Sequence, residues 1–87
     1  MTKEQAKEKL MRISRAAEAA DVSKQTIEYY IMLGLIDPIR PPGSRGRFFD
    51  KSLIQRIQLI RRMNKSGYTL RDIRQIYLKD KGPKSKQ

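Results

Sequence analysis

The sequence predicts a small, mostly α-helical domain of about four helices, completed by one short β-hairpin. Apolar residues recur at helical spacing in four stretches of the chain, and each stretch begins at a residue that can cap a helix. Between the second and third stretches, residues 37–49 are rich in proline and glycine, which excludes a helix there. With 87 residues, the chain is expected to form one domain around a small core.

The composition of the chain excludes several classes of function. There is no His and no Cys, so the usual zinc ligands, thiol chemistry and the commonest general base are missing, and we expect no enzyme, metal or cofactor. Lys and Arg number 20 against nine acids, and the net charge of +11 should attract a polyanion. Nucleic acid is the leading partner, although surplus charge can also simply keep a domain soluble. Without an apolar membrane span or signal core, the chain is expected in the cytoplasm.

The N-terminal part of the chain predicts an arm and a first helix. Residues 1–10 are rich in helix formers and should be either a frayed helix or a disordered arm. The first helix is predicted at residues 12–20, with Ser14 as its N-cap. Its stripe is made mainly of small residues, which permit close helix approach: Ile13, Ala16, Ala17 and Ala20. The short connection Asp21-Val22 fits a helix-turn-helix and an ordinary helical hairpin equally well.

The second helix, within residues 23–33, is the element around which the chain is organised. Ser23 can cap it, because a hydroxyl accepts a hydrogen bond from an unpaired amide of the first turn, and Gly34 can end it in a left-handed conformation. The apolar stripe comprises Ile27, Tyr30 and Ile31. The outward positions are polar: Lys24, Gln25, Glu28 and Tyr29.

Residues 37–49 are predicted to form a wing. Residues 39–40 and 47–49 could pair as an antiparallel hairpin on either side of a Pro-Gly turn. The segment between Asp37 and Asp50 has no acid but carries three arginines, namely Arg40, Arg45 and Arg47. A guanidinium fork suits phosphate, because it can bind two oxygens at once, although flexible loops also often carry stray arginines.

The third predicted helix, residues 51–66, is the core helix. Asp50 is its N-cap and Gly67 ends it. It has the strongest helical pattern of the chain, formed by Leu53, Ile54, Ile57, Ile60 and Met63.

A fourth helix is expected to run to about Leu78, beginning at Thr69 and Asp72, which resemble a capping box. Its apolar stripe is Leu70, Ile73, Ile76 and Tyr77. Residues 79–87 have no apolar side chain and should be a disordered basic tail, so the folded domain is expected to span residues 11–78.

The order of these elements predicts a winged helix-turn-helix, and four sequence blocks resemble one family with that fold. The blocks are IxxAAxxADVSxxTIxYY from Ile13, GLIDP from Gly34, RxF from Arg47 and IRRMNKSGYTLRDI from Ile60. Over roughly residues 11–77 the chain resembles the N-terminal DNA-binding domain of the MerR family of bacterial transcription regulators. The resemblance implies sequence-specific binding to double-stranded DNA and regulation of transcription at the bacterial nucleoid.

In this family the second helix enters the major groove while the wing lies on the backbone. The resemblance therefore implies that Tyr29 contacts phosphate and that Arg47 grips the backbone beside it. Residues 23–26 should reach base edges, and Gln25 is the best candidate for reading adenine, because its amide both donates and accepts. The expected DNA-binding residues are Ser14, Arg15, Ser23, Lys24, Gln25, Thr26, Glu28, Tyr29, Arg40, Arg45 and Arg47.

The sequence departs from the family pattern at several positions. Glu28 stands where the family usually has Arg, and it could accept from a cytosine amine or, as we favour, form an ion pair with a neighbouring Arg. In the wing, Gly46 and Phe49 replace tyrosines, so two hydroxyls are lost while an aromatic plug remains. Family members continue into a long dimerising helix, whereas no heptad pattern follows Tyr77. We expect a monomer in solution that pairs on DNA or through segments beyond this chain.

Two other classes of function stay open from the sequence. An excisionase-like or architectural DNA-binding protein uses a similar winged module. An RNA-binding or basic interaction module is less favoured, because several aromatic residues are assigned to the core and few remain as platforms for stacking bases.

Overall fold

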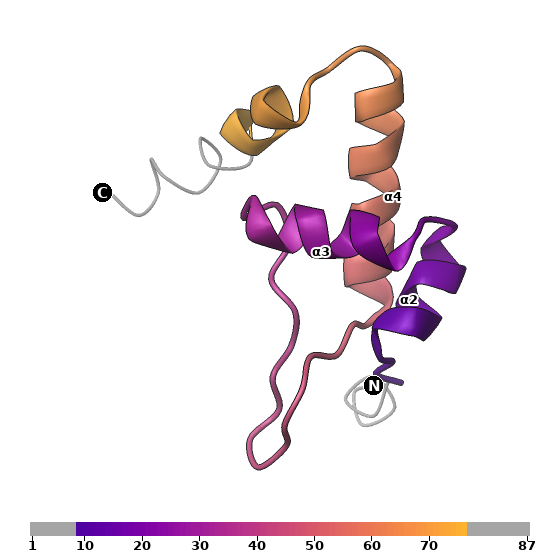
Figure 1. Cartoon of the computed structure of the whole chain (residues 1–87), viewed down its shortest axis with the longest axis vertical. Helices are drawn as coiled ribbons and strands as arrows, with labels where there is room; N and C mark the ends of the chain where they lie inside the picture. The colour runs from indigo at the N-terminus through magenta and orange to yellow at the C-terminus, as the bar shows by residue number, and fades with distance from the viewer. Residues whose placement is uncertain (1–8, 77–87) are drawn as a thin grey trace.

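The structure of the chain, a computed structural model, describes residues 9–76. It contains the helices α2 (Ile13–Ala20), α3 (Lys24–Met32) and α4 (Lys51–Lys65), and residues 70–76 form a further helical segment. Helix α2 packs against both α3 and α4. Between α3 and α4 the chain makes a long excursion away from the helices, and this excursion is the wing (Figure 1). The mostly α fold expected from the sequence is confirmed.

The core between the helices is apolar. Within the described residues no polar or charged side chain is buried. The largest fully buried side chains come from α3, α4, the segment 70–76 and the connection between α3 and α4: Ile27, Leu35, Phe49, Ile57, Ile60 and Ile73. Helix α2 contributes the buried alanines Ala16, Ala17 and Ala20, as its stripe predicted. Because these side chains are small, α2 lies close to its neighbours and holds α3 at a fixed place.

Local capping signals set the start of two helices as predicted. The Ser23 side chain accepts a hydrogen bond of 3.0 Å from the backbone N–H of Thr26, and α3 begins at the next residue, Lys24. Asp50 does the same for α4, where its Oδ1 accepts from the N–H of Leu53 at 2.9 Å. These bonds satisfy amides that a helix leaves unpaired at its start.

The start of α2 differs from the prediction. Ser14 is the second residue of the helix rather than its cap, and the N-cap is Arg12, whose side chain makes no capping bond. The physical reason lies just upstream: Met11 pairs with Phe49 through two backbone hydrogen bonds of 2.9 and 2.8 Å. This pairing holds Met11 in an extended conformation, so the helix starts two residues later, at Ile13, with Arg12 between them as the N-cap.

The wing is paired more sparsely than a full hairpin. Ile39 and Phe48 exchange two backbone hydrogen bonds of 2.8 and 2.9 Å, but this antiparallel bridge is isolated. Pro41 and Pro42 follow in the chain and have no N–H group to donate, which prevents a longer ladder on that side. The predicted pairing of the two segments is therefore present, while the predicted β-hairpin is reduced to a single bridge.

The helical segment 70–76 begins at the predicted capping box. The N–H of Thr69 donates to Asp72 at 3.2 Å, and the N–H of Asp72 donates to the Thr69 hydroxyl at 3.0 Å. Of the predicted stripe, Ile73 is fully buried, but Ile76 is 46% exposed, because the end of the segment points away from α4 (Figure 1). The predicted end of this helix, the basic tail and residues 1–8 of the arm lie outside the described residues.

Candidate nucleic-acid interface

One side of α3 is buried and the other is polar and open. Ile27 and Tyr30 are buried in the core, whereas Tyr29 is 47% exposed, so the tyrosine pair divides between core and surface as predicted. The residues Ser23, Lys24, Gln25 and Glu28 are exposed on the outer side. Thr26 is half-buried, and its hydroxyl lies 2.9 Å from the Ser23 hydroxyl. The start of α3 is thereby held rigidly while its outward side chains stay accessible.

The wing is tied to this outer side of α3 by an ion pair. Nη1 and Nη2 of Arg47 donate to the two carboxylate oxygens of Glu28 at 2.9 and 2.8 Å, across 19 residues of sequence. Hydrogen bonding to the Arg47 guanidinium lowers the pKa of Glu28, and the same bonds raise the pKa of Arg47. The expected intramolecular ion pair of Glu28 is thus present, and its partner is the wing arginine that was expected on phosphate.

The other wing arginines are more open. Arg45 is exposed, and Arg40 makes a long hydrogen bond of 3.4 Å to the Asp37 carboxylate, which is itself almost fully exposed. Such contacts in water hold a side chain only weakly. Both guanidinium groups are therefore available to an anion.

Arg12 joins the wing, which the sequence did not predict. Its guanidinium carbon lies 4.8 Å from the centre of the Phe48 ring, a cation–π arrangement. Gly46 leaves the room for it, because a Cβ atom there would be 3.3 Å from Nη1 of Arg12. The interaction joins residues 36 positions apart, so no local pattern could have indicated it.

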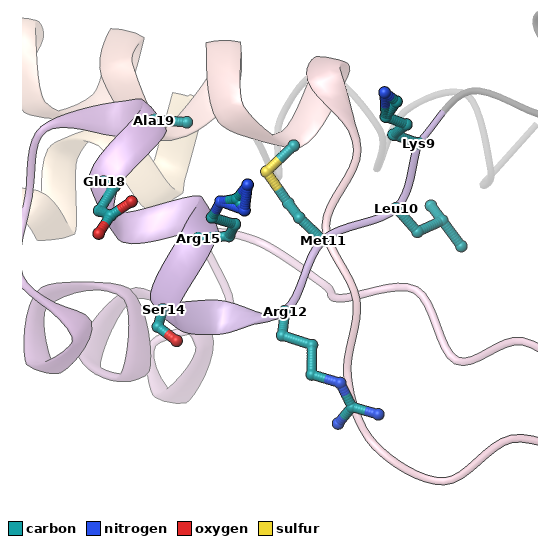
Figure 2. Close-up of a pocket in the computed structure, with 8 residues that line it drawn as sticks. All are labelled: Lys9, Leu10, Met11, Arg12, Ser14, Arg15, Glu18 and Ala19. Carbon is teal, nitrogen blue, oxygen red and sulfur yellow. The ribbon is translucent and has the colours of Figure 1, made fainter.

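Ser14 and Arg15, both expected at the interface, line one groove together, but only Ser14 also lies beside the start of α3. Ser14 lines a shallow hollow together with Ser23, Lys24 and Arg61, at the start of α3. Arg15 lines an open groove of about 820 Å³ whose walls are Lys9, Leu10, Met11, Arg12, Ser14, Arg15, Glu18 and Ala19 (Figure 2). Figure 2 shows the side chains of Arg12 and Arg15 leaving the chain in opposite directions. The structure thus brings Ser14, but not Arg15, to the start of α3.

A second long-range contact fixes the other end of α3. Nε of Arg74, in the segment 70–76, donates to the backbone carbonyl of Leu33 at 2.6 Å. A cation at a helix C-terminus is favourable, because the last carbonyls are unpaired and carry partial negative charge. Gly34 follows with a φ of 79° and lies against the same guanidinium. Sequence reasoning missed this contact, since 41 residues separate its partners.

The described residues offer no metal site and no helix able to span a membrane. Between residues 9 and 76 no three His, Cys, Asp or Glu side chains come together in a way that could hold a metal ion. The same part of the chain has no helix that is both long and apolar enough to cross a bilayer.

Comparison with known proteins places this geometry in a family. The model of the family described as MerR HTH family regulatory protein matches residues 11–79. An uncharacterised HTH-type transcriptional regulator of Bacillus subtilis, YyaN, is 34% identical over 71 residues, which are 82% of this chain and 51% of that protein. The mercuric resistance operon regulatory protein of Bacillus cereus is 36% identical over 62 residues, or 71% of this chain and 47% of that protein.

A solved structure agrees with the sequence comparisons. The transcription regulator PbrR691 from Ralstonia metallidurans CH34, in complex with lead(II), superimposes with a TM-score of 0.69 at 38% identity, over 80% of this chain and 55% of that chain. The present chain spans about half the length of the curated relatives it matches. Since the family model covers most of the sequence and the fold agrees with that of a solved relative, the chain belongs to the MerR HTH family of regulatory proteins.

Proposed function

We propose that this chain is a sequence-specific, double-stranded DNA-binding module of bacterial transcription regulation, in which α3 enters the major groove and the wing lies on the backbone. One observation carries the proposal: the exposed side of α3 and the arginine-bearing wing lie next to each other, joined by Glu28 and Arg47. A helix and a cationic loop on one surface are what groove and backbone binding require. The net charge of +11 supports a polyanionic partner.

The contacts divide into two groups. We propose that Ser23, Lys24, Gln25 and Thr26 reach base edges, because residues at the start of a recognition helix point into the groove. Tyr29, Arg40, Arg45 and Arg47 would hold phosphates, joined by Ser14 and Arg15 on the flanks of the site. We add Arg12 to the residues proposed to contact phosphates, because its guanidinium lies over the Phe48 ring of the wing. A regulator of this kind would act in the cytoplasm, where the bacterial nucleoid lies, and would have no enzymatic activity.

We also propose that the 87-residue chain binds a single half-site as a monomer. A net charge of +11 makes free copies repel one another at low salt, and neutralisation by DNA removes that repulsion. Sedimentation at high micromolar concentration should give one species with the mass of a single chain. A stable dimer at that concentration would contradict the proposal and would identify an apolar contact among the exposed side chains.

The proposed function is tested by a binding and selection experiment. Fluorescence anisotropy should detect binding to a labelled random-sequence duplex, and selection from a randomised duplex pool should then enrich one short motif. With the five proposed arginines on phosphates, log K should fall with log[salt] at a slope of about −4 to −5. Tighter binding to single-stranded RNA of equal length would favour the RNA-binding alternative. Tight duplex binding with no enriched motif would favour an architectural role.

A further inference from the structure

We infer that the Glu28–Arg47 ion pair is a self-contact that DNA must open, so that Glu28 lowers the affinity for non-cognate DNA and raises discrimination between sites. The inference rests on the proposed function, and it concerns the residue at which the chain departs from the family pattern. Two parallel N–H···O bonds of 2.9 and 2.8 Å join the partners. A guanidinium binds phosphate in the same two-oxygen arrangement, so the Glu28 carboxylate occupies the place that a phosphate would take.

The pair lies where DNA is expected. Glu28 follows Gln25 by one helical turn and precedes Tyr29, and all three are exposed on the outer side of α3. The side chains of Glu28 and Arg47 are 50% and 32% exposed, so the pair is accessible to a ligand. A contact of this kind is also weak enough to open, since exposed ion pairs are worth little in water.

In the closed state, the pair removes one cation from the surface that binds the backbone. The two side chains together carry no net charge, and the end of the Arg47 fork is occupied. In the open state, Arg47 can take a phosphate, but the Glu28 carboxylate is left unpaired beside a polyanion. At sites that offer Glu28 no hydrogen-bond donor, either state weakens DNA binding relative to a chain without this acid.

A suitable base changes that balance. In the major groove, the N4 amine of cytosine is a donor that a carboxylate can accept from. Where a cytosine faces Glu28, its N4 amine donates to the carboxylate, and Arg47 can then bind a backbone phosphate. At sites without such a donor, nothing offsets the free energy needed to break the Glu28–Arg47 pair. Discrimination of this kind works by penalising wrong partners rather than by strengthening the right one.

The test compares Glu28→Gln with a matched charge change elsewhere. Glu18 is exposed on α2, and Glu18→Gln alters the net charge by the same amount. On a random-sequence duplex, Glu28→Gln should raise the affinity about two- to fivefold, as expected for release of an exposed ion pair. It should also steepen the salt slope by roughly 1, because one more phosphate is neutralised. Glu18→Gln should change both quantities less.

A second background makes the result specific to the pair. In Arg47→Ala, the further change Glu28→Gln should raise random-duplex affinity less than it does when Arg47 is present and should leave the salt slope nearly unchanged, because it relieves only the repulsion of the backbone by Glu28 and releases no arginine. An equal gain with and without Arg47 would mean plain repulsion of the backbone by Glu28, and a loss of affinity in Glu28→Gln would mean that Glu28 aims Arg47 at the DNA. Either outcome overturns the inference while duplex binding itself, and thus the proposed function, still stands. Circular dichroism of each variant verifies folding.

Discussion

Phe49 is the residue on which the wing depends, and replacing it gives the sharpest test of how the interface is built. Its side chain is 0% exposed, and its backbone pairs with Met11, so it joins the wing, the N-terminal segment and the core. Phe49→Ala should cost about 3–5 kcal/mol of unfolding free energy, from lost transfer energy and the cavity left behind. Small domains have only about 5–15 kcal/mol in total, so most of the stability should be lost.

The assay is urea denaturation followed by circular dichroism, together with thermal melting. A loss of this size should lower the melting temperature by at least about 12 °C, since each kcal/mol corresponds to about 4–8 °C in a domain of this size. The adjacent Phe48 is a matched control. Its side chain is only half-buried, and its ring centre lies 4.8 Å from the guanidinium carbon of Arg12. Phe48→Ala should cost only about 1–2 kcal/mol. Equal losses in the two variants, or a loss below about 1 kcal/mol in Phe49→Ala, would refute the assignment of Phe49 to the core.

Three further predictions follow from the described contacts. Gln25→Ala should reduce discrimination at one base pair by about 1–3 kcal/mol and leave random-duplex affinity nearly unchanged; equal losses on both DNAs would make Gln25 a phosphate contact. Arg74→Ala removes the hydrogen bond to the Leu33 carbonyl and should destabilise the fold by about 1–3 kcal/mol in urea denaturation, whereas an unchanged midpoint would show that the bond contributes nothing. Because its partner lowers the pKa of Glu28 below 4.5, the stabilisation from the ion pair should be present above that pH and lost as the pH falls through the lower folded-state value. A carboxyl NMR titration should show this pKa return towards 4.5 in Arg47→Ala; no difference between the two proteins would exclude the pair in solution.

The parts of the fold that local chemistry decides could be predicted from the sequence. Ser23 and Asp50 cap their helices because a short polar side chain reaches an amide only three residues away. Tyr29 and Tyr30 separate into surface and core because neighbouring residues on a helix point about 100° apart. An ion pair between Glu28 and a neighbouring arginine could also be predicted, because an acid among many cations readily finds a partner.

The parts that depend on distant segments could not be predicted in the same way. Ser14 has the chemistry of a cap, but the pairing of Met11 with Phe49 starts the helix earlier than a local rule would. The bond from Arg74 to α3 and the placement of Arg12 on the wing join residues far apart in the sequence. Helical periodicity says which side of a helix is buried, but not which distant side chain meets it.

The bond between Arg74 and Leu33 makes helix α3 and the segment 70–76 energetically dependent on each other. Helix α3 is the element proposed to enter DNA, and the segment 70–76 is the last part of the chain that the structure describes. If DNA binding stabilises α3, the Leu33 carbonyl at its end becomes a better acceptor for Arg74. The segment 70–76 is then held more firmly against α3. By reciprocity, any event that pulls the segment away must weaken DNA binding by the same free energy. A fluorophore on this segment would therefore report the binding of α3 to DNA, although the segment itself is not proposed to contact the DNA.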